Sequence, residues 1–176
     1  MKTICLYFEI HQITHLKRYR FFEIGSDHYY YDDYANEQGI NEVAERSYIP
    51  VLNTLIDMAK NNGGAFKVAL SISGVALEQL EIHAPAVIEL LHELNATGCC
   101  EFICEPYSHG LSSLANEDCF REDVENMRKK VKDYFGQDPK IFRNSSLIYD
   151  NEIGGIVASM GFKGMLVEGE IGRAHV

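Results

Sequence analysis

Polar side chains that could do acid–base or binding chemistry follow five apolar runs along this sequence. In chain order they are Glu9, His11 and Gln12, then Ser73 (followed by Gly74), then Glu105 and His109, then Asn144 and Ser146, and last Glu168. In parallel α/β architectures ligands bind at the carboxyl edge of the strands, because the loops converge there while helices cover the faces. The spacing therefore predicts that these polar groups share one ligand-binding rim.

The elements that must position this rim alternate between short strands and helices. The apolar runs predict strands at residues 4–8, 66–72, 101–104, 141–143 and 164–167. Periodic apolar positions and punctuation by Pro, Gly and Asp predict helices from Ser47 to about residue 61, from Pro85 to Gly98, over 120–136 and over 151–160. This alternation predicts an α/β fold with parallel strands, and by itself it fits either an incomplete barrel or an open doubly wound sheet.

Composition narrows the classes of partner. The 176 residues carry 26 acidic and 16 basic side chains, a net charge of -10 that disfavours nucleic acid and anionic membrane surfaces as partners. The five cysteines form no C-x-x-C pair, so we expect reduced thiols, no metal site and a cytoplasmic protein. No cofactor is expected.

One segment is specific enough to suggest a family. Residues 142–149, Phe-Arg-Asn-Ser-Ser-Leu-Ile-Tyr, resemble the nucleophile segment of glycoside hydrolase family 57 amylases, with Ser146 where that family carries a catalytic glutamate. His11 and Gln12 resemble its His-Gln-Pro motif, with Ile13 in place of proline. Residues 98–111, with Glu101, Tyr107 and His109, resemble its second region, and the resemblance spans residues 1–169.

The resemblance implies a fold and a substrate class. It implies the N-terminal portion of an incomplete seven-stranded (β/α) barrel, truncated here to a domain of residues 1–169, from a retaining enzyme of α-1,4-glucans such as starch, glycogen or maltooligosaccharides. The acid–base aspartate of such an enzyme would lie beyond residue 176. By the same resemblance, the residues expected to bind substrate are His11, Gln12, Glu101, His109 and Asn144.

Each of these residues also has a structural interpretation. The two histidines could bond loop backbone, Glu101 could pair with a buried cation, and Gln12 or Asn144 could cap a turn. Arg143 is expected to be an ion-pair partner inside the barrel, and Glu105 either orients His109 or faces solvent.

Three functions are compatible with this resemblance, and Ser146 bears on the choice between them. A serine hydroxyl is neutral and shorter than a glutamate, and no general base adjoins it in sequence, so we expect weak or absent hydrolysis. The alternative is a non-catalytic glucan-binding or regulatory homologue. A metal-dependent polysaccharide deacetylase would need an Asp-Asp pair and a His-x-x-x-His pair, but the chain has Glu9 with Ile10 and has Ser113 four residues after His109.

Two segments stand apart from the regular pattern. About thirty residues, 9–39, separate the first strand from the next helix and hold seven aromatic side chains, which could stack on sugar rings or pack the loop against the barrel. The last seven residues, 170–176, can be written in codons that resemble a common sequencing adapter, so we expect them to be an artefact.

Overall fold

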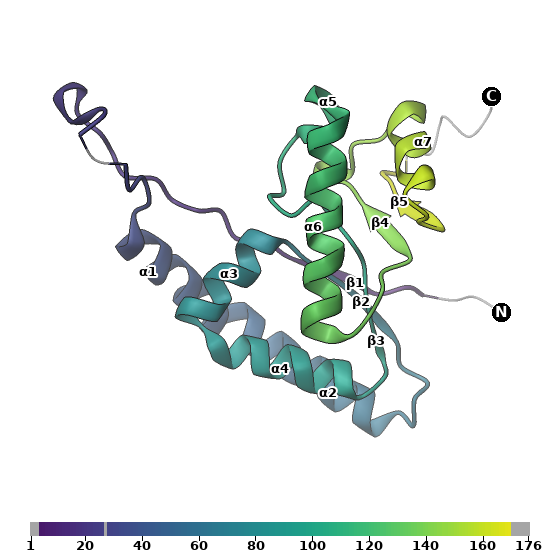
Figure 1. Cartoon of the computed structure of the whole chain (residues 1–176). Helices are drawn as coiled ribbons and strands as arrows, with labels where there is room; N and C mark the ends of the chain where they lie inside the picture. Colours follow the sequence, from purple (N-terminus) through teal and green to yellow (C-terminus); the bar gives the residue numbers. More distant parts are fainter. Residues whose placement is uncertain (1–3, 27, 170–176) are drawn as a thin grey trace.

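The structure, a computed structural model, describes residues 4–26 and 28–169, and its strands run parallel in chain order (Figure 1). Strands β1 (Tyr7–Ile10), β2 (Val68–Ile72) and β3 (Cys100–Phe102) form one parallel sheet, and β4 (Ile141–Arg143) pairs with β5 (Gly164–Leu166). A bridge between Cys104 and Phe142 joins the two sheets, with the Arg143 amide donating to the Cys104 carbonyl at 2.8 Å. The described strands therefore form one run of neighbours, as the sequence predicts.

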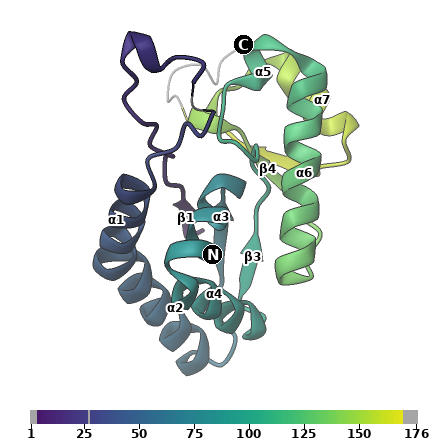
Figure 2. The ribbon, with the colours of Figure 1, turned by 60° about the vertical axis from the view of Figure 1, so that its left-hand side comes forward.

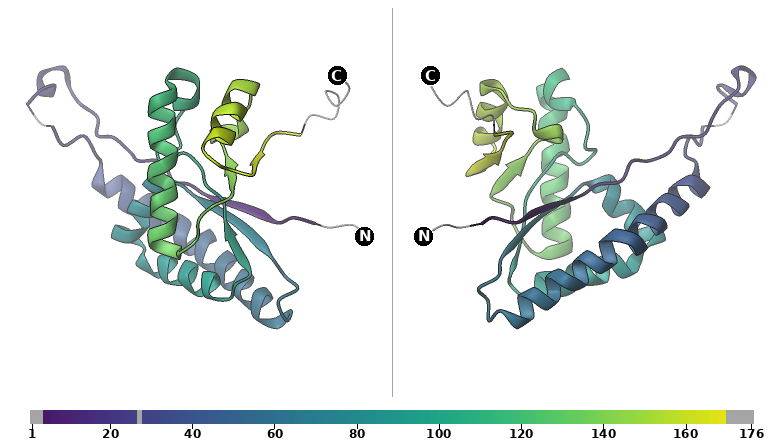
Figure 3. Two further views of the ribbon diagram at one scale, coloured as in Figure 1. Left: turned by 45° about the vertical axis from the view of Figure 1, so that its right-hand side comes forward. Right: turned by 180° about the vertical axis from the view of Figure 1, so that it is seen from behind.

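Helices pack beside this sheet and connect its strands. They are α1 (Asp33–Val43), α2 (Ile49–Asn61), α3 (Gly74–His83), α4 (Pro85–Ala96), α5 (Ser112–Ala115), α6 (Glu117–Phe135) and α7 (Asn151–Ser159). A π-helical turn, η2 (Ala44–Tyr48), joins α1 to α2 into one long rod, which Figure 3 shows from two sides. Two 3₁₀ turns, η1 (Phe21–Glu23) and η3 (Ser145–Leu147), complete the described elements.

Strand alternation gives the sheet one apolar and one polar face. Ile10, Leu70, Ile72, Phe102 and Phe142 lie on one face and are at most 5% exposed, within a core that the helices complete. Phe102 stacks on Phe135 of α6 with ring centroids 3.9 Å apart. Residues of opposite parity form the other face, which we call the polar face: Tyr7, Glu9, Ala69, Ser71, Glu101 and Arg143. The functional side chains lie at the carboxyl end of this face.

The helix predicted from Ser47 to about residue 61 is present as α2, but the helix before it was not predicted. That helix, α1, begins at Asp33, where the Asp32 carboxylate caps it by accepting from the Ala35 amide at 3.1 Å, and Ser47 lies inside the π-helical turn between α1 and α2. Helix α3 was not predicted. The Ser73 hydroxyl caps it by accepting from the Ala76 amide at 3.2 Å, directly after β2, so strand and helix follow each other without a loop.

We expect truncation to alanine to destabilise the protein far more at a buried leucine than at an exposed isoleucine. Leu91 of α4 is fully buried, so we expect Leu91→Ala to lower the free energy of unfolding by about 2–5 kcal/mol through the cavity it leaves. Ile82 of α3 is 73% exposed, and Ile82→Ala should change that free energy by less than about 0.5 kcal/mol. Urea unfolding measures both, and equal losses would contradict this packing.

Candidate functional site

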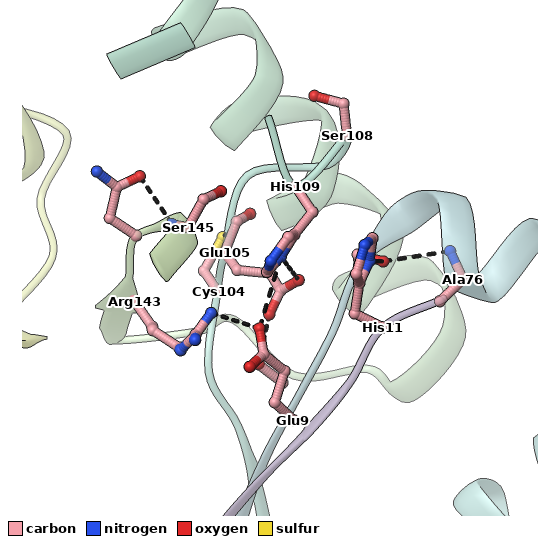
Figure 4. Close-up of polar contacts among 12 residues, drawn as sticks. Glu9, His11, Ala76, Cys104, Glu105, Ser108, His109, Arg143 and Ser145 are labelled. Atoms are coloured by element: carbon pink, nitrogen blue, oxygen red, sulfur yellow. Dashed lines mark hydrogen bonds and ion pairs between the residues drawn. The ribbon is translucent and has the colours of Figure 1, made fainter. Parts of the chain in front are cut away.

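Five polar side chains from three segments converge at the carboxyl edge of the sheet (Figure 4). Glu9 and His11 come from β1 and the residues after it, Glu105 and His109 follow β3, and Arg143 ends β4. Glu9 and Arg143 are 134 residues apart in sequence, yet they form an ion pair through Arg143 Nη1. We call these five residues the rim cluster.

Glu105 is the buried carboxylate of the rim cluster, with an exposed fraction of 0%. The Ser71 hydroxyl donates to its Oε2, and His109 Nδ1 lies 3.3 Å from its Oε1. Because the Ser71 proton is used in this way, the Tyr7 hydroxyl donates to Ser71 Oγ at 2.7 Å. Burial raises the pKa of Tyr7 to about 12, so this chain of donors keeps its protons at neutral pH. Because water cannot solvate a fully buried carboxylate, the protein must supply the hydrogen-bond donors.

Glu9 is the accessible carboxylate of the rim cluster, with a side chain 27% exposed. Its Oε1 accepts from Arg143 and lies 3.5 Å from His109 Nδ1. Partial burial raises the pKa of Glu9 above its usual value, although the Arg143 guanidinium acts in the opposite direction. Arg143 is itself buried, and its Nε has no hydrogen-bond partner within residues 4–26 and 28–169.

His11 and His109 stack face to face, with ring centroids 4.0 Å apart and an interplanar angle of 19°. Ser73 Oγ accepts from the Ala76 amide and lies 2.8 Å from His11 Nδ1, within hydrogen-bond distance. Burial, and then the nearby His109, lower the pKa of His11, whereas the hydrogen bond that His109 donates to Glu105 raises the pKa of His109. A neutral imidazole therefore lies against one that protonates readily, and each ring keeps its Nε2 for a ligand.

The loop that carries His109 is clamped between two helices. The Tyr107 ring lies against Gly74 at the start of α3, and its hydroxyl donates to Glu78. On the other side, the Ser108 amide and hydroxyl donate to Asp123 of α6. His109 has a φ of 53°, a left-handed conformation that non-glycine residues rarely adopt and that this clamp maintains.

Ser146 is exposed and lies in a strained turn. It has φ 52° and ψ 24°, and Leu147 after it has φ 56°. Asn144 holds the turn: its Nδ2 donates to Ser113 Oγ and to the Ile148 carbonyl, both at 3.0 Å, and its Oδ1 accepts from the Ser145 amide. Asn144 is fully buried, so its amide serves the turn and does not face a ligand.

The structure does not bring the other predicted site residues together with the rim cluster. Gln12 points toward α1, where its Nε2 would lie 3.4 Å from a Cβ at Gly39. Glu101 is exposed on the polar face but precedes Glu105 by four residues, about 13 Å along an extended strand. Of the residues expected to bind substrate, His11 and His109 are the two that meet.

The sequence analysis missed Ser71 as a member of the site. Ser71 lies beside Glu9 on the polar face, but this neighbourhood can be predicted only when the register between β1 and β2 is known. Arg143 was predicted as an internal ion-pair partner, and Glu105 as a group that orients His109; both contacts are present.

Three members of the rim cluster have donor atoms close enough to hold a metal ion. The relevant oxygens and nitrogen of Glu9, Glu105 and His109 lie within 4.8 Å of one another. The Arg143 guanidinium, however, contacts the Glu9 oxygen that an ion would need, and its positive charge opposes a cation there. The arrangement is thus an ion-pair network that would have to open before it could hold a metal.

Within residues 4–26 and 28–169, no helix has the length and apolar character needed to cross a bilayer. The predicted adapter tail, residues 170–176, lies outside the described residues.

A family profile and a curated relative match most of the chain. The profile of the family described as Glycosyl hydrolase family 57 matches residues 5–175. A curated protein of Methanocaldococcus jannaschii named Putative alpha-amylase is 38% identical over 168 residues, which are 92% of this chain and 35% of that protein. The chain therefore spans about a third of that relative's length.

Solved structures show the same fold at lower identity. A 4-alpha-glucanotransferase from Thermococcus litoralis superposes with a TM-score of 0.70 and 17% identity, over 93% of this chain and 22% of that one. A CE4 family pseudoenzyme from Bacillus anthracis gives a TM-score of 0.53 and 12% identity, over 65% of this chain and 37% of that one. The first likeness confirms the prediction of the N-terminal part of a β/α barrel with parallel strands.

The rim cluster predicts opposite titrations for the two stacked histidines. The pKa of His109 is raised in the folded protein, so its contact with Glu105 stabilises the fold fully below the ordinary value of 6.5, and this gain is lost as the pH rises through the raised value. His11, with a lowered pKa, contributes in the opposite sense, and loses its contribution as the pH falls. NMR titration of the two rings should give values on either side of 6.5, and identical values would refute the assignment.

The clamp on the His109 loop predicts that Gly74 tolerates no side chain. A Cβ there would lie 2.4 Å from the Tyr107 ring, so we expect Gly74→Ala to lower the free energy of unfolding by about 1–3 kcal/mol. Gly155 of α7 is the matched control, because a Cβ there meets no atom within 4 Å, and Gly155→Ala should stabilise by about 0.4–1 kcal/mol. Unfolding in urea compares them, and two stabilised variants would contradict the close contact.

Proposed function

Because the chain belongs to glycosyl hydrolase family 57, we propose that it provides part of an α-glucan site, with the rim cluster binding sugar hydroxyls and with little or no hydrolysis. Its ligand would be an α-1,4-glucan such as starch, glycogen or a maltooligosaccharide. The observation that carries the proposal is the pair of stacked imidazoles, His11 and His109, on the same chain as a strained turn that presents Ser146 in place of a carboxylate.

Sugar hydroxyls suit the groups that the rim cluster leaves free. A hydroxyl both donates and accepts; the Nε2 of an imidazolium donates, whereas that of a neutral imidazole donates or accepts according to its tautomer. The Glu9 carboxylate can accept from a further hydroxyl while it keeps its bond to Arg143. Such contacts bind a neutral polymer without the loss of ion pairs that a charged ligand would cause.

Retaining glycoside hydrolysis needs two carboxyl groups about 5–5.5 Å apart, one as nucleophile and one as acid and base. Ser146 is neutral and shorter than a glutamate, and the turn η3 holds no general base beside it. Glu105 is no substitute, because it is fully buried and its two oxygens are occupied by Ser71 and His109. Glu9 is held by Arg143, which lowers its nucleophilicity.

A non-catalytic glucan-binding or regulatory homologue is the alternative within the family. It would use the same contacts and would differ in showing no turnover at all. A cytoplasmic location, also part of this proposal, fits the free state of the five cysteines. We expect neither nucleic acid nor membrane to compete for the acidic surface.

The deacetylase function rests on one specific observation, the donor atoms of Glu9, Glu105 and His109. Arg143 on Glu9 disfavours it, and Ser113, four residues after His109, accepts a hydrogen bond from Asn144 as part of the turn. We therefore rank the deacetylase function after the two glucan functions.

The proposal is tested in the full-length gene product by comparing binding with turnover. We expect calorimetry to detect binding of maltoheptaose while reducing ends form at or near the background rate. His109→Ala should abolish the binding heat, and Ser146→Glu should raise hydrolysis by at least about a hundredfold by restoring the carboxylate. Steady hydrolysis by the unmodified protein would refute the loss of catalysis, and absence of binding heat would refute the glucan site.

A further inference from the structure

A long connection between β1 and α1 forms an ordered arm rather than a loose loop. Residues 13–26 and 28–32, which we call the aromatic arm, extend away from the body of the protein (Figures 1 and 2). Its two sides pair as an antiparallel ribbon: the Lys17 amide donates to the Tyr30 carbonyl at 2.8 Å, and the Asp32 amide donates to the His15 carbonyl at 3.0 Å. The turn η1 closes its outer half, where the Arg20 amide donates to the Glu23 carboxylate at 2.8 Å.

The aromatic side chains of this arm face solvent. Phe21 and Phe22 are 81% and 92% exposed, and Tyr31 is 49% exposed although its backbone lies within the ribbon. Within residues 4–26 and 28–169, these rings are therefore not buried against the sheet or its helices. A fixed backbone that presents open rings is typical of a recognition surface, because little conformational entropy remains to be lost on binding.

The rings are arranged in pairs along the ribbon. Tyr29 and Tyr31 meet edge to face at 5.8 Å, while Tyr19 and Tyr30 lie 5.5 Å apart. Successive residues of an extended strand point to opposite faces, so the two pairs lie on different faces of the arm. At the tip, Phe21 and Phe22 form a third pair at 5.4 Å.

The arm is continuous with the rim cluster. It starts two residues after His11, and Gln79 Nε2 of α3 donates to the Gln12 carbonyl at 3.1 Å, which fixes the start of the arm to the helix that Ser73 caps. A second anchor is reciprocal: the His15 amide donates to Asn36 Oδ1 at 2.6 Å, and Asn36 Nδ2 donates back to the His15 carbonyl at 3.2 Å. A ligand that leaves the cluster toward this edge therefore meets the rings on one face of the arm.

We propose that the aromatic arm is an extension of the glucan site, on which successive glucose rings of a chain stack while one end of the chain lies at His11 and His109. This inference rests on the proposed function. Glucose rings have apolar faces with hydroxyl edges, which match exposed tyrosine and phenylalanine rings whose rims are polar or open to water. The occupant is a neutral polysaccharide chain longer than the rim cluster can hold.

Glucans of different length distinguish binding at the arm from binding at the rim cluster, and the experiment uses the full-length gene product. The double variant Phe22→Ala/Tyr31→Ala should bind linear amylose about tenfold more weakly while it binds maltotriose as the unmodified protein does. Phe22→Tyr/Tyr31→Phe keeps the rings and should bind amylose normally. Ile82→Ala, an exposed apolar change on α3, is the matched control and should change neither affinity.

Each result assigns the failure to one hypothesis. If the unmodified protein binds neither sugar, the proposed function fails and the arm inference fails with it. If it binds both and the double variant keeps full affinity for amylose, the arm inference alone is overturned. Equal weakening for both sugars would overturn it too, as would a change in molar mass by light scattering in the double variant, which would assign the arm to protein docking.

Discussion

The desolvated carboxylate of Glu105 is the interaction on which the site depends. A fully buried negative charge must be satisfied by donors, and here they come from Ser71 on β2 and His109 on the following loop. Satisfying it fixes the His109 ring, which in turn stacks on His11, and places the same ring nitrogen near Glu9. The charge thus positions side chains from three segments, and Arg143 balances the second carboxylate.

Much of the framework could be predicted because local signals determine it. Gly136 ends α6 in a left-handed conformation with φ 69°, and Asp150 caps α7 by accepting from the Ile153 amide at 2.7 Å. The start of α1 was missed because its cap, Asp32, follows a run of tyrosines that was assigned to a loop. Helix α3 was missed because apolar residues surround it and give no clear amphipathic period.

The site was predicted less completely, since it depends on side-chain direction. That His11 and His109 share one rim follows from strand ends alone, but Gln12 turns toward α1 and Asn144 turns into its own loop. Neither direction is encoded in residue type or spacing. The pairing of Glu9 with Arg143 needs the register of four strands, which short-range patterns do not supply.

Under the proposed function, a site with a polar framework but with Ser146 in place of a carboxylate separates binding from catalysis. The turn that presents Ser146 has a left-handed backbone and an Asn144 anchor, and its side chain lacks the charge that a retaining mechanism uses. Intact-mass spectrometry after incubation with an activated fluorinated glucosyl donor tests this account most directly, because such a donor accumulates as an ester on any competent nucleophile. The account predicts an unchanged mass for the native protein. A glucosyl adduct that maps to Ser146, Glu9 or Glu105 would contradict it.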